Sequence, residues 1–143
     1  MIADSVRSKI CNEVGDVKYC ILVDESVNES NKKHMAIILR HVDGVGFVRE
    51  RFFEVVCVDN TCILILKEEI CNVLNQSNLL VENLRGQGYG DASSMHGKWN
   101  RLQTLFIKDC LYAYYVHCFA HRLQLVLFAV SKEYMMYGYF FLN

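Results

Sequence analysis

The sequence predicts an α/β fold, a mixed five-stranded sheet with helices on both faces. Two β-rich runs occupy residues 35–58, and strand-like and helical patterns alternate after them. An antiparallel hairpin followed by such an alternation is typical of a mixed sheet covered by helices. No internal repeat or low-complexity tract interrupts the chain, which indicates a single domain.

The first three strands carry the clearest patterns. YCILVD (19–24) is an almost continuous apolar run that ends on Asp24, which is typical of a central strand buried on both faces. MAIILRH (35–41) and VGFVRERFFEVVCV (45–58) flank an Asp-Gly pair at 43–44. Both residues of such a pair can take positive φ, so the pair predicts a hairpin turn. Charges on both faces of the second run predict an edge strand.

The later elements are predicted from changes in the spacing of the apolar residues along the chain. A helix is expected over 59–76 and a strand over 79–84. An amphipathic helix should follow the glycine-rich segment, and then a strand at 113–118. Residues 120–132 are apolar almost all round, which is typical of a buried helix. These assignments depend on the candidate caps Asp59, Asn60 and Thr61 and on the apolar positions Leu66, Ile70, Val73, Leu74, Trp99, Leu102, Leu105 and Phe106.

The composition is that of an intracellular globular domain. Apolar residues make up 52% of the chain and charged residues 22%. The net charge of −1 provides no general attraction to nucleic acid or to an anionic membrane. Seven cysteines without a C-x-x-C pair, and an N-terminus without an apolar signal core, predict reduced thiols in the cytosol or nucleus. No run approaches the roughly 18 apolar residues of a membrane span.

The segment RGQGYGDASSMHG (85–97) holds four of the eight glycines around Asp91. Three interpretations compete: a mobile surface loop, a chain of tight turns, or a loop that presents Asp91 to a metal or a phosphate. Asp24 ends the first strand and Asp91 follows the fourth, so the two carboxylates converge if these strands are neighbours. Paired carboxylates are a minimal cage for Mg²⁺, although acids after strands also serve as helix caps.

Four ordered blocks resemble the transposase-like domain of hAT-superfamily elements, in the branch of zinc-finger MYM-type proteins. The resemblance covers residues 17–130 and leaves an N-terminal segment (1–16) and a divergent apolar tail (131–143). It implies a ribonuclease-H-like fold of strand order 3-2-1-4-5, an Asp-Asp-Glu triad that binds two Mg²⁺ ions, DNA as substrate and a nuclear location. The blocks are VDES (23–26), AIILRHVDGVGFVRERFFEVVCV (36–58), RGQGYGDASSMHGKWNRLQ (85–103) and YYVHCFAHRLQLVL (114–127).

The resemblance makes Asp24 and Asp91 the candidate catalytic and metal-binding residues. Asp24 matches the first acid, and the second lies in a family block written YDGASNM, which here reads YGDASSM. Gly90 therefore holds the position of the aspartate, and Asp91 is displaced by one residue, or about 3.5 Å. This shift predicts that Mg²⁺ is not bound productively. No residue before Asn143 matches the third acid, so the domain is expected to be incomplete at its C-terminus.

Two further clusters are candidates for binding. His117, Cys118 and His121 form an H-C-x-x-H cluster, but a structural zinc site needs four ligands, and a packing role is favoured over zinc. Arg85, Lys98 and Arg101 place positive charge around the glycine segment. They are candidate phosphate contacts, although a solvated helix face is the ordinary meaning of such charges.

Three classes of function remain open from the sequence. The leading hypothesis is a catalytically inactive, transposase-derived domain that retains interactions with nucleic acid or protein. The second is a metal-dependent DNA strand-transfer or nuclease domain, completed by another chain or by a further C-terminal half. The third is a binding module that self-associates through its apolar C-terminal region. None of the three involves a membrane.

Overall fold

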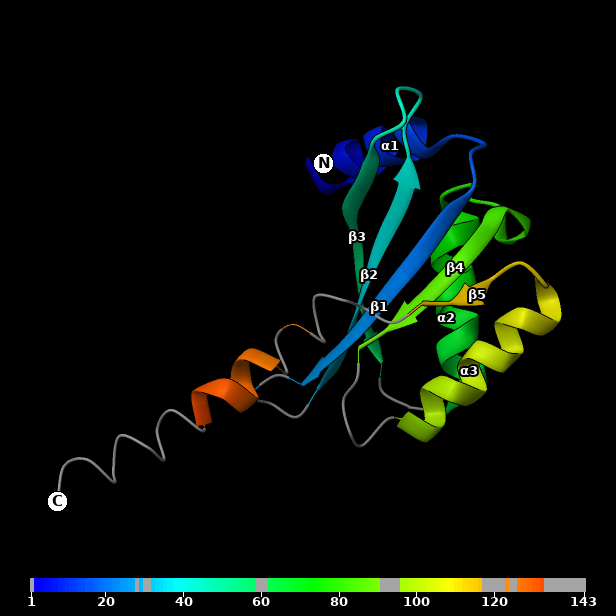
Figure 1. The fold of residues 1–143 in the computed structure, drawn as a ribbon. Coiled ribbons are helices and arrows are strands. Elements are labelled where there is room, and N and C mark those ends of the chain that lie inside the picture. The colour runs from blue at the N-terminus through cyan, green and yellow to red at the C-terminus, as the bar shows by residue number, and fades with distance from the viewer. Residues whose placement is uncertain are drawn as a thin grey trace, which may run out of the picture.

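The computed structural model describes residues 2–27, 29, 32–58, 62–90, 96–116, 123 and 126–132. It confirms a five-stranded mixed sheet with helices (Figure 1). In chain order the elements are α1 (Ile2–Val14), β1 (Tyr19–Val27), β2 (Lys33–Val42), β3 (Val48–Val58), α2 (Ile63–Gln76), the 3₁₀ helix η1 (Val81–Asn83), β4 (Leu84–Tyr89), α3 (His96–Asp109) and β5 (Tyr114–Tyr115).

The sheet has the strand order β3-β2-β1-β4-β5, as predicted. β1 pairs antiparallel with β2 and parallel with β4, and β5 extends the parallel part. β3 is an edge strand, also as predicted. The carboxyl ends of the neighbouring strands β1 and β4 therefore lie side by side, at the same end of the sheet.

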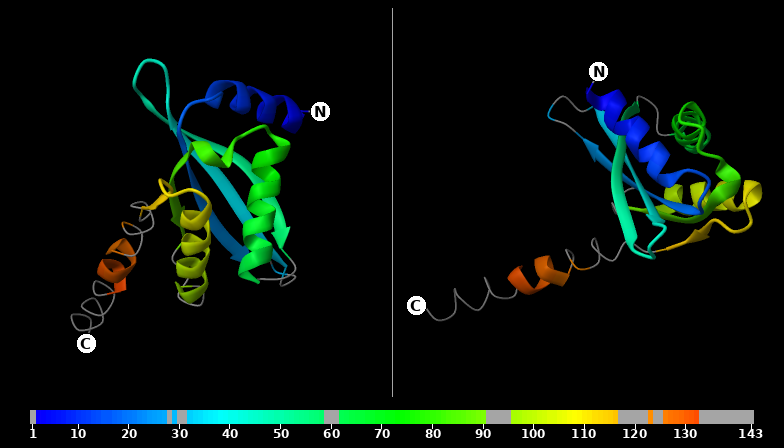
Figure 2. Two further views of the ribbon diagram at one scale, coloured as in Figure 1. Left: turned by 90° about the vertical axis from the view of Figure 1, so that its right-hand side faces the viewer. Right: turned by 90° about the horizontal axis from the view of Figure 1, so that it is seen from above.

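The core lies between one face of the sheet and the helices α1, α2 and α3 (Figure 2). Alternate residues of β1 and β2 point into it, because side chains alternate between the faces of a strand. The other face, called here the outer face, carries the intervening residues, such as half-buried Leu22 and exposed Asp24. The prediction that β1 is buried on both faces is therefore wrong in the described part of the chain, where all three α-helices of the body share one face. The buried strand residues are Tyr19, Ile21, Val23, Met35, Ile37 and Leu39, and the helices contribute Val14, Leu66, Ile70, Leu74, Leu102 and Phe106.

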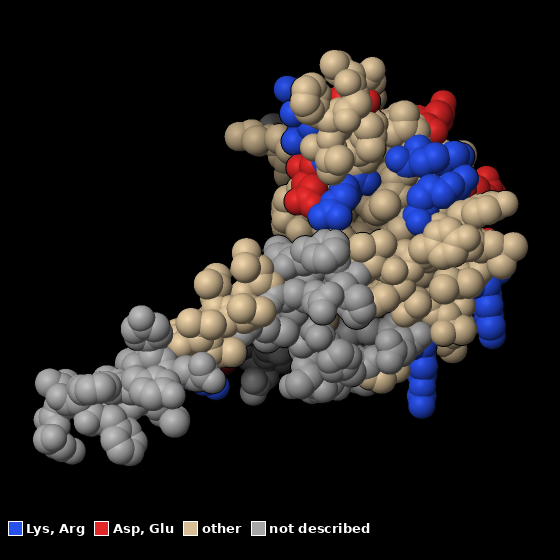
Figure 3. Space-filling view, viewed as in Figure 1, with Lys and Arg blue, Asp and Glu red and all other residues tan. Residues whose placement is uncertain are grey.

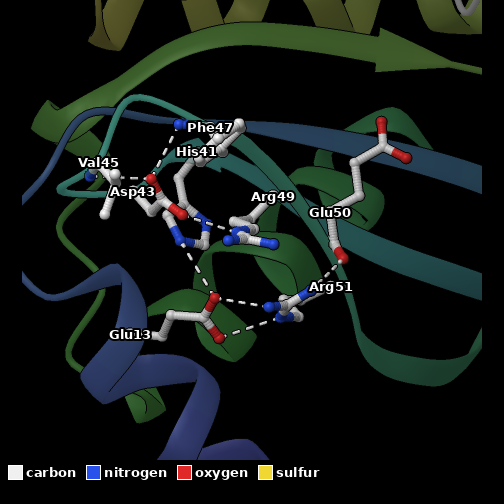
Figure 4. Close-up of polar contacts among 8 residues, drawn as sticks. All are labelled: Glu13, His41, Asp43, Val45, Phe47, Arg49, Glu50 and Arg51. Atoms are coloured by element: carbon white, nitrogen blue, oxygen red, sulfur yellow. Dashed lines mark hydrogen bonds and ion pairs between the residues drawn. The ribbon is translucent and has the colours of Figure 1, made fainter.

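The hairpin between β2 and β3 forms as predicted, but its turn differs. The loop is longer than the expected two-residue turn, and the residue with positive φ is Gly46 (+94°), not the 43–44 pair. Asp43 closes the loop with its carboxylate, which accepts hydrogen bonds from the backbone N–H groups of Val45 (3.0 Å) and Phe47 (2.8 Å) and from Arg49 Nε (2.7 Å) (Figure 4). The Asp43 side chain thus adds to the backbone bonds of the loop, which run from the N–H of Gly46 to the oxygen of Asp43 (3.0 Å) and from the N–H of Asp43 to the oxygen of Phe47 (2.9 Å).

Three other expectations are corrected. α2 starts after Cys62, which makes no capping bond with its side chain, and the candidate caps at 59–61 lie outside the described residues. The strand expected at 79–84 is wrong, because η1 occupies part of it and the strand runs over 84–89. Residues 123 and 126–132 are helical but exposed, so the described part of the helix expected at 120–132 is not buried. None of the described helices is long and apolar enough to cross a membrane.

The helix α1, which no sequence pattern predicted, is attached to the hairpin by ion pairs. The Glu13 carboxylate accepts two hydrogen bonds from Arg51, at 2.7 and 3.0 Å, and lies 3.8 Å from Nε2 of the buried His41 (Figure 4). Arg7 pairs with Glu54 at 2.7 Å. The hydrogen bonds from Arg51 hold the pKa of Glu13 below its usual value. α1 therefore packs on the core face through both charge and its buried residues, Ile10 and Val14.

Replacing Asp43 by Asn should lower the melting temperature near neutral pH by a few degrees. The backbone N–H of Phe47, followed by Arg49, lowers the pKa of Asp43 in the folded state. A lowered carboxyl pKa adds stability above the unfolded-state value of about 4, and this stability is lost as the pH falls through the folded-state pKa. Melting curves of the wild type and the variant should therefore differ at about pH 7 and converge near about pH 3.

Asp16→Asn is the matched control, because it removes one exposed acid outside the hairpin. It should leave the melting temperature nearly unchanged. An Asp43→Asn deficit of the same size at both pH values would contradict the role assigned to the Asp43 carboxylate.

Candidate functional site

The first part of the glycine-rich segment is a strand, and residues 96–97 at its end belong to α3. Residues 84–89 form β4 beside β1, so the interpretations of this part as a mobile loop or as tight turns are wrong. Residues 91–95, including Asp91, lie outside the described residues. Glycines at 86, 88 and 90 recur with a period of two, which is the period of a strand. That spacing is the signal in the sequence that could have identified β4.

The glycines of β4 make room for side chains of β1 on the outer face. A Cβ added at Gly86 would lie 2.8 Å from the sulfur of Cys20. At Gly88 it would lie 2.8 Å from Leu22 Cδ2 and 2.9 Å from the backbone oxygen of Val116. Positive φ is not the reason for glycine at either position, because both residues are extended. The missing Cβ atoms let side chains of β1 lie over the backbone of β4.

The same arrangement places Asp24 against Gly90. The backbone N–H of Gly90 donates to the oxygen of Val23 at 2.8 Å, continuing the ladder past the end of β4. A Cβ at Gly90 would overlap the carboxylate oxygen Oδ1 of Asp24. The first acid of the expected site and the position of the second are therefore neighbours, and the carboxylate of the first occupies the space that a side chain at position 90 would need.

Glu25 is a second acid near this edge, but it does not join Asp24. Consecutive strand residues point to opposite faces, so the Glu25 carboxylate lies on the core side of the sheet. It pairs with Lys33 Nζ at 3.2 Å, and its oxygen Oε2 is buried without a hydrogen-bond partner among the described residues. The two carboxylates cannot share one metal ion.

A buried polar network fixes β4 from the core side. The side-chain amide of Gln87, which is fully buried, donates to the backbone oxygens of Ala113 (2.7 Å) and Gln103 (3.2 Å). The Tyr89 hydroxyl donates to Gln87 Oε1 at 2.5 Å, and burial raises the pKa of this hydroxyl. One side chain thus connects β4 to α3 and to the segment that enters β5. Gln87 was not among the predicted site residues, since no sequence pattern marks a buried amide.

The described residues do not fit the pair of Mg²⁺ ions that the resemblance implies. They contain no group of three or more His, Cys, Asp or Glu side chains that could hold a metal ion. At position 90, where the second acid would lie, the space is filled by the carboxylate of the first. Two ions about 4 Å apart need several carboxylates between them, and Asp24 alone does not supply these.

The candidate phosphate contacts do not form one surface with Asp24 in the described part of the chain. The Arg85 guanidinium donates to the backbone oxygens of Glu82 (2.8 Å) and Leu84 (2.9 Å) and lies 5.0 Å from the centre of the Tyr112 ring. Arg85 is at the start of β4, whereas Asp24 lies beside its end. Arg101 is exposed on α3, and the side chain of Lys98 lies outside the described part. Lys and Arg appear in separate groups on the face drawn in Figure 3, some of them beside Asp or Glu.

The cluster of His117, Cys118 and His121 lies outside the described residues. Its predicted packing role therefore stays a prediction.

The strand order, the antiparallel hairpin and the acid at the exit of β1 define the class, an RNase-like α/β domain. The sequence model of the ZMYM1/FAM200 RNase-like domain family matches residues 1–101. This match covers more than half of the chain, and the chain belongs to that family. The resemblance found in the sequence is thereby confirmed for a transposase-derived, RNase-like domain.

Replacing Gly88 by Ala should destabilise the domain by about 1–3 kcal/mol, the usual cost of overpacking. The added Cβ would meet Leu22 and the backbone oxygen of Val116, and a backbone atom cannot move aside easily. Gly44→Ala is the matched control, because a Cβ there meets nothing within 4 Å. Urea denaturation of both variants measures the difference. Equal stability of the two variants would show that β4 does not approach its neighbours this closely.

Proposed function

We propose that this chain is a catalytically inactive, transposase-derived RNase-like domain that acts by association rather than by cleavage. The observation that carries the proposal is the contact between Asp24 and Gly90. In the expected active site this position holds an acid, and here it holds a glycine against which the carboxylate of Asp24 rests. The nucleus, as the place of action, rests on the resemblance alone.

Loss of chemistry follows from the number of ligands at the edge. A two-ion site stabilises the attacking and the leaving oxygen of a phosphoryl transfer, and each ion needs carboxylates held within a few tenths of an ångström. A side chain at position 90 could reach this edge only if Asp24 turned away. Among the described residues no group of three or more ligands forms here, so Asp24 does not hold two ions, nor one ion more tightly than any exposed acid does.

Purified protein should therefore not cleave labelled DNA with Mg²⁺ or Mn²⁺. Binding of Mn²⁺, followed by its electron paramagnetic resonance signal, should be weak and equal in the wild type and in Asp24→Ala. Asp16→Ala is the matched control, because Asp16 is an exposed acid before the opposite end of β1. Cleavage that is retained in Asp16→Ala and lost in Asp24→Ala would contradict the proposal and favour the strand-transfer hypothesis.

Association is supported by two apolar surfaces that no other described residue covers. Leu123, Val126, Leu127 and Val130 follow the spacing of one helix face, and they are 49 to 61% exposed. Phe52 and Val55 on the outer face of β3 are 59% and 45% exposed. The helix extends away from the sheet (Figures 1 and 2). Exposed apolar patches beyond a few hundred Å² usually mark an interface.

We propose a second copy of the chain as the partner, because the helix face of one copy fits the chemistry of the outer sheet face of the other. If the helix of each copy packs on the sheet of the other, the dimer is symmetric and each contact forms twice. At about 25 cal/mol per Å², covering about 400 Å² contributes roughly 10 kcal/mol before the entropic cost of association. Because each contact forms twice, the total is roughly 20 kcal/mol; after an association cost of about 4–15 kcal/mol, the remainder is comparable to the about 8 kcal/mol that a micromolar dimer requires.

Leu127→Glu should weaken self-association by about tenfold or more, because it places a charge in the centre of the apolar stripe. Ala129→Glu adds the same charge on another side of the same helix and is the matched control. Sedimentation equilibrium at tens of micromolar measures both variants. A monomeric wild type, or equal weakening by the two substitutions, would contradict association through this stripe.

A further inference from the structure

The outer face carries a cysteine–histidine pair that plays no part in the site described above. His34 on β2 lies directly opposite Cys57 on β3 in the antiparallel register. The sulfur of Cys57 is 3.3 Å from Nδ1 of His34. The two residues are 23 positions apart in the chain, so no local motif marks the pair.

The environment of Cys57 differs from that of most other described cysteines. Cys57 is exposed, whereas Cys11, Cys20 and Cys71 are partly buried and Cys110 is buried. Burial raises the pKa of the thiols of Cys20 and Cys71, which disfavours their reactive thiolate form. Cys62 is also exposed. Exposure together with a histidine within proton-transfer distance is what a reactive thiol requires.

The position of the pair leaves the sulfur open to an incoming molecule. Cys57 lies one residue before the end of the edge strand β3, and none of the described strands pairs on its other side. Across β2, the neighbour of His34 is Ser26 on β1, which is also exposed. The row Ser26–His34–Cys57 is therefore polar, with Ser26 and Cys57 exposed and His34 half-buried, and it lies near the same end of β1 as Asp24.

We propose that Cys57 is a reactive thiol, with His34 as its base, that is modified by small disulfides such as glutathione disulfide. The Cys57 thiol passes its proton to Nδ1 of His34. The thiolate then attacks one sulfur of glutathione disulfide, a new S–S bond forms, and the old S–S bond breaks. One glutathione thiolate leaves and takes up a proton, and no other oxidant is required.

The experiment uses the full, reduced chain incubated with glutathione disulfide near neutral pH. Mass spectrometry of the digested protein follows the glutathione adduct on each cysteine separately. Cys57 should react about tenfold faster than Cys62, and His34→Gln should remove most of that advantage while leaving the rate at Cys62 unchanged. Ser26→Ala is the matched control, since it changes the other neighbour of His34 and should not alter the rate at Cys57.

Buried Cys110 reports whether each variant is folded, because it should remain unmodified in a folded chain. Equal rates at Cys57 and Cys62 in the wild type would overturn the proposal, as would an unchanged Cys57 rate in folded His34→Gln. If Cys110 reacts in the variant, the comparison of the two wild-type rates decides the question.

Discussion

The close approach of β1 to β4 across three glycines is the constraint on which the rest of the structure depends. Cys20, Leu22 and Asp24 lie over Gly86, Gly88 and Gly90 on the outer face, where side chains on β4 would need the same space. On the core side the same two strands contribute Ile21, Val23 and Tyr89, all of them buried. β4 is therefore asymmetric: it has no side chains on its outer face and buried side chains on its core face. This asymmetry determines which side chains of the sheet face solvent.

This asymmetry has different consequences on the two faces. On the core face, Gln87 makes its hydrogen bonds to α3 and to the segment before β5, so β4 is held by partners that cannot be exchanged for water. On the outer face, the missing side chains at 86, 88 and 90 leave a surface formed by β1, β2 and β3. That surface presents the Asp24 carboxylate at the end of β1, the exposed side chains of Phe52 and Val55 on β3, and a cysteine–histidine pair at the end of β3. Its chemistry suits contact with another molecule better than coordination of two ions.

Much of the fold could be predicted because its signals are local. The apolar run at 19–24 and the hairpin runs gave the first three strands, and helical spacing gave α2 and α3. The errors arose where tertiary contacts decide. Glycines suggested loops or turns, but Gly86 and Gly88 are required by the side chains of β1 rather than by φ. Asp43 was expected in the turn because its backbone can adopt positive φ. In the structure its carboxylate accepts hydrogen bonds from the backbone of the loop. The pairs Glu13–Arg51 and His34–Cys57 connect residues far apart in the chain, and nothing in a single sequence joins them.

The measurement that tests this account most directly is a double-mutant cycle between Gly86 and Cys20. A Cβ at position 86 would approach the sulfur of Cys20 at 2.8 Å, and its next neighbours lie at 3.4 Å or beyond. We expect Gly86→Ala to cost about 1 kcal/mol less in a Cys20→Ala background than in the wild type, because the sulfur atom that the new Cβ would meet has been removed. Denaturant unfolding of the four proteins gives this coupling free energy. An equal cost of Gly86→Ala in both backgrounds would contradict the claim that the glycines of β4 are there to make room for the side chains of β1.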